Sequence, residues 1–182
     1  MAALDFANGW EGLVTPSASG ARTPTAFSAR GGIVVFSGGS AANSLVDLFN
    51  QVCEANDATL SYVIPISDNG GSSSELIRVF GGPGIGDIRS RLVRLIPEDG
   101  LETIAIKAFF NYRLPPSYAT ARSEWLDIVE ANHLLWHGIS SPKRELIRSF
   151  LNAVNLEAVK RLRPSSRFDF SGASIGNLFL TG

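Results

Sequence analysis

Two short apolar runs in the first half of the chain predict buried β-strands. The first covers Ile33 to Phe36 and the second covers Leu60 to Ile66, and each is followed at once by polar residues and glycines. Between them, apolar residues recur at helical spacing and predict a helix. The buried face of that helix would consist of Leu45, Leu48, Phe49 and Val52. The order strand, helix, strand is that of a βαβ unit, so we predict an α/β protein with a parallel sheet.

The second half of the chain carries helical periodicity, and we predict a helical insertion at about 101–163. The expected helices are Leu101 to Phe110, Ser123 to about His137, and a long helix that opens at Ser141-Pro142. The apolar face of the long helix would consist of Leu146, Ile147, Phe150, Leu151 and Val154. We expect the aromatic side chains of this region to pack its core rather than to stack on a base. They are Phe109, Phe110, Trp125 and Trp136.

The composition of the first thirty residues differs from that of the rest. Residues 1–30 are rich in Ala, Ser, Thr, Gly and Pro, and we predict a flexible leader followed by one domain over 31–182. Asp5 and Glu11 argue against a transit peptide, because acidic residues are scarce in such peptides.

Only two convincing strands are found, and a sheet of two parallel strands is not expected to be stable. Parallel sheets usually contain several strands and are covered by helices on both faces. A new apolar run also begins at Leu178, close to the last residue. We therefore expect the sheet to be incomplete and this chain to be the N-terminal part of a longer domain.

A glycine-rich loop follows the first predicted strand and precedes a helix. Gly38 and Gly39 would let a ligand approach the backbone closely, and the helix N-terminus offers N–H groups and a positive dipole end to a phosphate. The spacing of the glycines fits neither the dinucleotide-binding pattern nor the Walker pattern. No lysine follows to reach a phosphate, so the motif by itself is weak.

The second predicted strand ends in two adjacent polar side chains, Asp68 and Asn69, followed by Gly70 and Gly71. In open α/β sheets, ligands bind outside the carboxyl ends of the strands, which is where these side chains would lie. The two glycines could turn their N–H groups inward and form an anion-binding nest. The same residues are also typical of an ordinary tight turn, so both interpretations remain open.

A third segment, Gly81 to Ser90, contains four more glycines before an expected helix. We expect Asp87 to cap this helix, whose apolar face would consist of Ile88, Leu92 and Leu95. Arg89 lies beside the loop, where its guanidinium group could clamp a phosphate or a carboxylate. Arg91 and Arg94 are expected on a solvated basic face.

In a fourth segment, Ser171 to Leu180, small residues give way to an apolar run. Asn177 stands at the junction, where its side chain suits either a ligand-binding amide or a helix cap.

Charge and cysteine content exclude several functional classes. The formal net charge is −1 and the isoelectric point is about 6.1, which argue against a nucleic-acid interface or a polybasic membrane patch. No apolar run approaches the length of a membrane span. The single cysteine, Cys53, excludes an intramolecular disulfide, is expected in the core and fits a cytosolic protein. His133 and His137 have the spacing of a metal pair on a helix, but no third ligand lies nearby in the sequence.

Together the four segments resemble the 2-phospho-L-lactate transferases of deazaflavin cofactor biosynthesis and the related gluconeogenesis-factor proteins, which bind nucleotide sugars. The resemblance runs from about Gly32 to the last residue. The family has a Gly-Gly-Gly-Thr-Gly loop, an Asp-Asp/Asn-Gly-Gly-Ser-Ser-Gly element, a Gly-Asp-Ile-Arg-Asn/Ser element and a Gly-His-Ser-x-Gly-Asn-Leu element. The matching segments here are Ser37–Ala41, Asp68–Ser74, Gly86–Ser90 and Gly172–Leu178.

The resemblance implies a Rossmann-like parallel sheet, with helices on both faces, that binds a nucleoside diphosphate derivative or a nucleotide sugar. In the transferase branch, a phospholactyl-type group moves from a guanosine diphosphate carrier to a hydroxyl of the deazaflavin precursor with the help of Mg²⁺. Asp68 and Asn69 would then be catalytic, with Asp68 as the metal ligand. The residues implied in binding the nucleotide and its phosphates are Gly38, Gly39, Ser40, Gly70, Gly71, Ser72, Asp87, Arg89, Ser174 and Asn177.

Departures from the family pattern keep alternatives open. Ala173 replaces the usual histidine, and Ala41 and Ser74 replace glycines. A non-catalytic nucleotide-sugar-binding regulator on the same fold is therefore one alternative, and an inactive truncated paralogue is another. Self-association as a homodimer also remains open.

Overall fold

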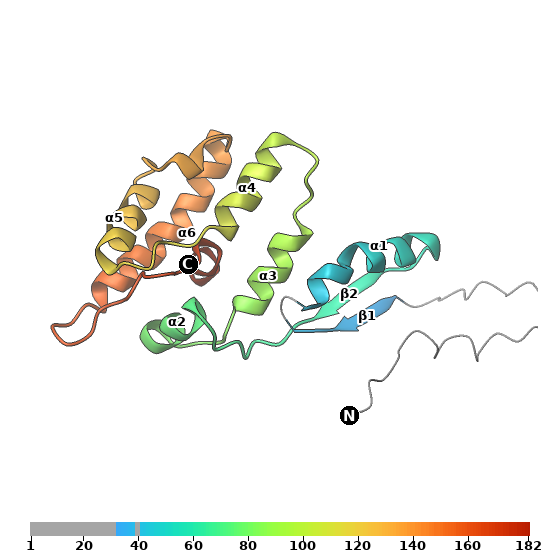
Figure 1. Ribbon diagram of the computed structural model, residues 1–182, viewed down its shortest axis with the longest axis horizontal. Helices are drawn as coiled ribbons and strands as arrows, with labels where there is room; N and C mark the ends of the chain where they lie inside the picture. Colours follow the sequence, from blue (N-terminus) through green and yellow to red (C-terminus); the bar gives the residue numbers. More distant parts are fainter. Residues whose placement is uncertain (1–31, 39–40) are drawn as a thin grey trace, which may run out of the picture.

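The computed structural model describes residues 32–38 and 41–182 (Figure 1). It is an α/β structure with a small parallel sheet of two strands, β1 (Ile33–Phe36) and β2 (Leu60–Val63), in which Ile33 lies opposite Leu60. Both predicted strands are confirmed. The second strand is shorter than expected and ends before Pro65, whose nitrogen cannot donate a ladder hydrogen bond.

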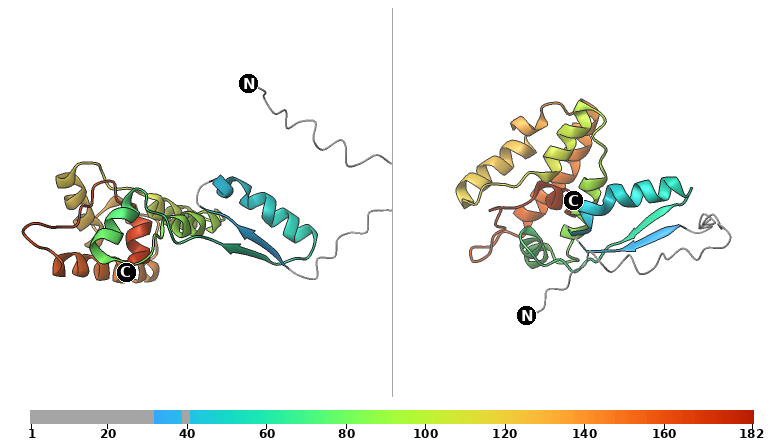
Figure 2. Two further views of the ribbon diagram at one scale, coloured as in Figure 1. Left: turned by 90° about the horizontal axis from the view of Figure 1, so that it is seen from below. Right: turned by 45° about the vertical axis from the view of Figure 1, so that its right-hand side comes forward.

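The 3₁₀ helix η2 (Ala41–Leu45) and the helix α1 (Val46–Ala55) connect the two strands. Phe49 of α1 packs edge to face on Tyr62 of β2, so α1 covers one face of the sheet (Figure 2). The predicted buried face of α1 is wrong, because Val46 and Cys53 are its buried residues. The exposed residues of the predicted face are Leu45, Leu48 and Val52. Burial of Cys53 confirms its place in the core.

The other helices gather on one side of the sheet unit (Figure 1). They are α2 (Ser72–Phe80), α3 (Gly86–Leu95), α4 (Leu101–Asn111), α5 (Tyr118–Val129), the 3₁₀ turn η3 (Leu134–Trp136), α6 (Ser141–Lys160) and α7 (Ile175–Thr181). The predicted helix at 101–110 and the long helix from Ser141 are confirmed. Within the parts of the chain that are described, no helix is both long and apolar enough to cross a membrane.

The helix predicted from Ser123 to His137 is wrong at both ends. It begins earlier, at Tyr118, and stops at Val129, because Ala131 adopts a left-handed backbone conformation with φ of +66°. The two histidines therefore do not share a helical face. Nδ1 of His133 accepts a hydrogen bond from the backbone N–H of Leu135 (3.1 Å). Over residues 32–38 and 41–182, no three metal-ligating side chains come together.

The hydrophobic core lies among the helices, as the aromatic residues predicted. Trp125, Trp136 and Phe109 are fully buried there, and each indole N–H has an acceptor: Asn155 Oδ1 for Trp125 and the Ile128 carbonyl for Trp136, both at 2.9 Å. The short helix α7 lies at the centre of this core and packs against α2, α3, α4 and α6 (Figure 1). The fourth sequence motif is thereby placed against the second and the third.

Candidate functional site

The turn after β2 is organised by the carboxylate of Asp68. Its Oδ1 accepts a hydrogen bond from the Gly70 N–H (3.0 Å), and its Oδ2 accepts one from the hydroxyl of Ser73 (2.6 Å). The first of these bonds is the one that defines a tight Asx turn. Each oxygen still keeps a lone pair, because each accepts only one bond. Asn69 and Gly70 are exposed beside it, and Gly71, with φ of +51°, leads into α2.

The third motif presses directly against Asp68. A Cβ atom on Gly84 would lie 1.8 Å from the Asp68 carbonyl oxygen, and one on Gly86 would lie 1.9 Å from Asp68 Oδ2. The Gly84 N–H also donates to the carbonyl of Ile66 (2.8 Å). Only glycine fits at these two positions, because the backbone there lies so close to Asp68 that any side chain would displace it.

A chain of buried polar side chains joins α2 to α7. The hydroxyl of Ser72 accepts hydrogen bonds from Asn177 Nδ2 (2.9 Å) and from the backbone N–H of Ser174 (3.2 Å). The side chain of Ser174 is fully buried, and its Oγ has no hydrogen-bond partner. Of the two roles left open for Asn177, the helix cap does not apply, because Ser174 is the N-cap of α7 and Asn177 lies inside the helix. Its amide links two motifs instead.

The segment after α4 fixes α7 in this position. The Leu114 N–H donates to the Ala173 carbonyl (2.9 Å), and the Ile175 N–H donates to the Tyr112 carbonyl (3.0 Å). Main-chain bonds of this kind hold the start of α7 in register with the loop before α5, so Ser174 and Asn177 do not depend on their side chains alone for placement.

Arg89 reaches α7 from α3. Its Nε donates to Asn177 Oδ1 (3.2 Å), and its Nη1 lies 3.4 Å from Asn111 Oδ1. Burial, followed by the positive charge of Arg113, lowers the pKa of Arg89, while the carboxylate of Asp68 acts in the opposite direction. The charges of Arg89, Arg113 and Asp68 therefore lie close enough to affect one another. Two positive charges and one negative charge leave a net positive charge, which favours an anionic ligand.

The sequence did not predict Arg113 or Asn111. Nη1 of Arg113 donates to the Gly172 carbonyl (3.3 Å) and lies 3.8 Å from the place where a Cβ on Gly71 would stand. Arg113 stands before a Leu-Pro-Pro linker that carries no chemical signal of its own, so only the fold reveals that it is near the second motif.

Asp87 does not cap α3, which corrects the prediction. The helix begins at Gly86 and its N-cap is Ile85, so Asp87 lies in the first turn, where a negative charge favours the helix dipole. Asp87 Oδ2 lies 3.5 Å from the place where a Cβ on Gly38 would stand, so it faces the loop after β1. Gly39 and Ser40, also predicted in this loop, lie outside the described residues.

The face that α3 buries is also different from the predicted one. Arg91 and Val93 are buried, while Leu92 and Leu95 are exposed. Arg94 forms an ion pair with Asp47 of α1 (2.6 Å). The face of α3 expected to be solvated and basic therefore packs on η2 and α1, because α3 lies between the sheet unit and the helical core.

The donor set around Asp68 suits Mg²⁺. This ion is usually held by one or two carboxylates, together with water and substrate phosphates. Asp68 offers one free lone pair on each oxygen. Asp87 follows Gly86, which contacts Asp68, and no side-chain hydrogen bond to Asp87 is found in the described parts of the chain.

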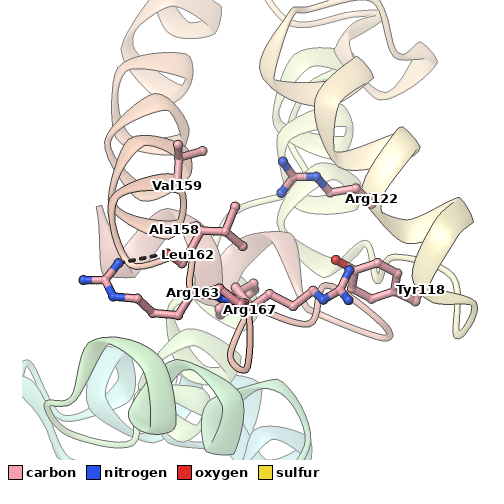
Figure 3. A pocket seen from close by; sticks show the side chains of 9 residues that line it. Tyr118, Arg122, Ala158, Val159, Leu162, Arg163 and Arg167 are labelled. Atoms are coloured by element: carbon pink, nitrogen blue, oxygen red, sulfur yellow. Dashed lines mark hydrogen bonds between the residues drawn. The ribbon is translucent and has the colours of Figure 1, made fainter.

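A separate hollow of about 510 Å³ lies between α5 and the end of α6 (Figure 3). Tyr118, Arg122, Arg163 and Arg167 surround a floor that includes Ala158 and Leu162. Arg163 donates hydrogen bonds to the carbonyls of Lys160 and Leu162, so it satisfies backbone acceptors at the C-terminal end of α6. None of the residues predicted for the site lines this hollow.

The described glycine loops meet polar and charged side chains beyond the ends of two parallel strands, which defines an α/β protein with its candidate site at that edge of the sheet. Residues 33–182 match the family of the 2-phospho-L-lactate transferase CofD, and the chain belongs to that family. The resemblance seen in the sequence is thereby confirmed.

One relative in Saccharomyces cerevisiae, the uncharacterized protein YNL011C, is 46% identical over 150 residues, which cover 82% of this chain and 33% of the relative. The chain therefore spans about a third of the length of that relative. No solved structure matches the chain.

Proposed function

We propose that the chain forms the phosphate-binding part of a CofD-like transferase, which moves a phospholactyl-type group from a nucleoside diphosphate carrier to an acceptor hydroxyl. The convergence of separate motifs supports this most directly. Asp68 and Ser72, from the second motif, lie with Arg89 from the third and Asn177 from the fourth in one network of hydrogen bonds and charges. Membership of the family supports the same reaction class.

The charges and dipoles around α2 suit a diphosphate. The N-terminus of this nine-residue helix presents N–H groups beside Gly71, and Arg113 lies next to the same glycine. Arg89 adds a second guanidinium group that is held in place by Asn177 and Asn111. Phosphoryl-type transfer depends mainly on positioning and electrostatic stabilisation, so no nucleophilic side chain is required.

Asp68, together with Asp87, would hold Mg²⁺ against the phosphate oxygens. The ion would supply charge stabilisation where negative charge develops during transfer. The Ser73 hydroxyl and the Gly70 N–H keep the Asp68 carboxylate in one orientation. Asn69, exposed beside it, would orient the acceptor hydroxyl.

Ala173 favours a second candidate function, a nucleotide-sugar-binding regulator without catalysis. The family has histidine at this position, and here the alanine side chain is buried in the hydrophobic core. An imidazole that could transfer a proton is therefore missing from this place. The remaining phosphate-binding groups would still serve a sensor.

Nucleotide binding tests both candidates before any turnover is measured. We expect guanosine, uridine or adenosine diphosphate to raise the melting temperature of the 182-residue chain, and Mg²⁺ to increase the rise. An assay for transfer of the phospholactyl-type group to a deazaflavin precursor would then distinguish a transferase from a regulator. A melting temperature that no nucleoside diphosphate changes, with or without Mg²⁺, would contradict both functions.

A further inference from the structure

The hollow between α5 and the end of α6 has an apolar floor that is partly exposed (Figure 3). Ala158 and Phe168 in its lining are buried, but the side chains of Val159 and Leu162 are 50% and 56% exposed. The volume of about 510 Å³ is ample for one large apolar side chain. Exposed apolar surface with a polar rim is typical of an interaction site.

The rim of the hollow carries three arginines, Arg122 from α5 and Arg163 and Arg167 from the loop after α6. None of them forms an ion pair with an acidic residue that the structure describes. The carboxylate of Glu157, near the end of α6, is paired with other cations. The rim therefore carries positive charge that is not neutralised locally.

Asp169 is the acidic group to weigh against these arginines. It lines a neighbouring hollow together with Tyr118 and Arg167, and its Oδ1 accepts a hydrogen bond from the Ser171 N–H (2.9 Å). One negative charge beside three positive charges leaves a net positive charge, which favours an acidic ligand.

Aromatic rings orient two of the guanidinium groups. Arg122 lies over the ring of Phe170, 5.5 Å from its centroid, and Arg167 lies over the ring of Tyr118 at 5.3 Å. A guanidinium group that stacks on a ring keeps N–H donors free at its edge. Neither side chain forms a hydrogen bond within residues 32–38 and 41–182, so both retain donors for a carboxylate.

The loop that carries Arg163 and Arg167 is held in place from two sides. Arg163 and Ser166 exchange two backbone hydrogen bonds, of 2.8 and 3.1 Å. Arg78 of α2 donates to the Arg167 carbonyl (2.9 Å) and to the Ser166 hydroxyl (3.2 Å). This part of the rim is therefore organised before a ligand binds, which lowers the entropic cost of binding.

We propose that this hollow docks an acidic peptide segment of a partner protein. An apolar or aromatic side chain of the segment packs on Val159 and Leu162, and flanking carboxylates bind Arg122 and Arg167. A peptide fits better than a small metabolite, because most of the lining side chains are exposed and would not enclose a small ligand. Arginine and tyrosine are also enriched in protein interfaces. No residue of the candidate phosphate site lines the hollow, so the inference does not rest on the proposed function.

Calorimetric titration of the 182-residue chain with short peptides tests this docking. The probes are capped peptides in which leucine, phenylalanine or tryptophan stands between glutamates on both sides. Control peptides have serine at the centre, or glutamine in place of every glutamate. Inorganic phosphate is the small-anion probe, and each titration is made at two salt concentrations.

Variants assign the binding to the hollow. Arg122→Met and Arg167→Met, alone and together, remove the carboxylate partners, and Leu162→Ser removes part of the apolar floor. Lys160→Met is the matched control, because Lys160 lies at the same end of α6 but is paired with Glu157 (2.8 Å). Melting temperatures without peptide show whether each variant folds, and nucleoside diphosphate binding should be unchanged in all of them.

We expect at least one acidic peptide to bind the wild type, and to bind more weakly at the higher salt concentration. Each single arginine variant should bind it about threefold to fivefold more weakly, and the double variant about tenfold or more with little salt dependence left. Leu162→Ser should weaken binding about threefold and keep the salt dependence. Lys160→Met should stay within about twofold of the wild type.

Several results would overturn the proposal. One is wild-type protein that binds none of the acidic peptides, or that binds the serine-centred peptide equally well. Another is a double arginine variant that binds within about twofold of the wild type; if that variant does not fold, the exposed Arg167→Met decides by the same criterion. Phosphate that displaces the peptide at comparable concentration would assign the hollow to a small anion. Loss of self-association in the arginine variants would assign it to a second copy of the chain.

Discussion

Asp68 holds the turn after β2, and its proposed chemical role as a metal ligand can be separated from this structural one through its hydrogen bonds. Both oxygens already accept bonds, from Gly70 N–H and Ser73 Oγ. An asparagine could keep both, because its carbonyl oxygen can accept from Gly70 and its amide can donate to a reoriented hydroxyl. Asp68→Asn therefore removes the negative charge while leaving the turn in place.

We expect Asp68→Asn to leave the free energy of unfolding within about 0.5 kcal/mol of wild type. In a transferase it should lower turnover about a hundredfold or more and change nucleotide affinity much less, because the carboxylate acts on the charge that develops during transfer. In a regulator it should only weaken binding modestly. Turnover, affinity and melting temperature are the three measurements.

Asp99→Asn is the control for this prediction. Asp99 Oδ1 also accepts a hydrogen bond from a hydroxyl, that of Thr103 (3.1 Å), but at the start of α4. If Asp68→Asn proves as silent as Asp99→Asn in all three measurements, Asp68 belongs to the turn alone and the site assignment is wrong.

At the scale of elements, Glu102 links the starts of α4 and α6. Its Oε1 accepts from the Ser140 N–H (2.9 Å) and its Oε2 accepts from Lys143 Nζ (2.7 Å). These bonds, that to Lys143 first, lower the pKa of Glu102 to about 2 from an ordinary value of 4.5. Because the pKa is lower in the folded state, the stabilisation is complete above about pH 4.5 and is lost as the pH falls toward 2.

Glu102→Gln should therefore flatten the acid side of the stability profile. Between pH 4.5 and 2 the wild type should lose more stability than the variant, as measured by urea unfolding at several pH values. Glu54→Gln, which changes an exposed glutamate on α1, serves as the control. Parallel profiles for wild type and Glu102→Gln would show that the contact is not maintained in solution.

Periodicity predicted the existence of most elements, but not which face each helix buries. β1, α4 and α6 follow directly from their apolar patterns. On α1 and α3 the exposed stripe is as apolar as the buried one, so burial depends on partners far away in the sequence. The helix break at Ala131 has no local signal, since alanine favours helices.

The residues of the candidate site could be predicted from the sequence where they belong to a recognisable motif. Asp68, Arg89 and Asn177 stand in recognisable segments, and the fold brings them together. Arg113 and the burial of Arg91 were not predictable, because a lone arginine is usually solvated. Only packing distinguishes such a residue from an ordinary surface arginine.

At the scale of the whole molecule, α1 covers one face of the sheet, and no other described element covers the opposite face. The side chains of Val34, Phe36 and Val63 project from the face opposite α1, and Phe36 is 77% exposed. Parallel sheets are normally covered on both faces. We therefore expect the 182-residue chain, produced alone, to be marginally stable and to self-associate through this surface.

Phe36→Thr should reduce self-association without lowering the melting temperature, because threonine keeps β-propensity while the exposed ring is lost. Light scattering and size-exclusion chromatography measure the effect. Leu101→Thr is the control, since Leu101 is 87% exposed on α4. A monomeric wild-type chain with a sharp cooperative melt would contradict the expectation.

The central position of α7 has a consequence for synthesis on the ribosome. Ser72 and Asn177 are separated by 105 residues, yet they bond to each other in the finished site. At roughly 5 to 20 residues per second, the ribosome needs on the order of 5 to 20 seconds after α2 to synthesise α7. During that interval the polar groups of Ser72 and Arg89 and the apolar faces of α4 and α6 stay uncovered. Nascent chains released before α7 has emerged should therefore depend on chaperones, while those released after it can close their core.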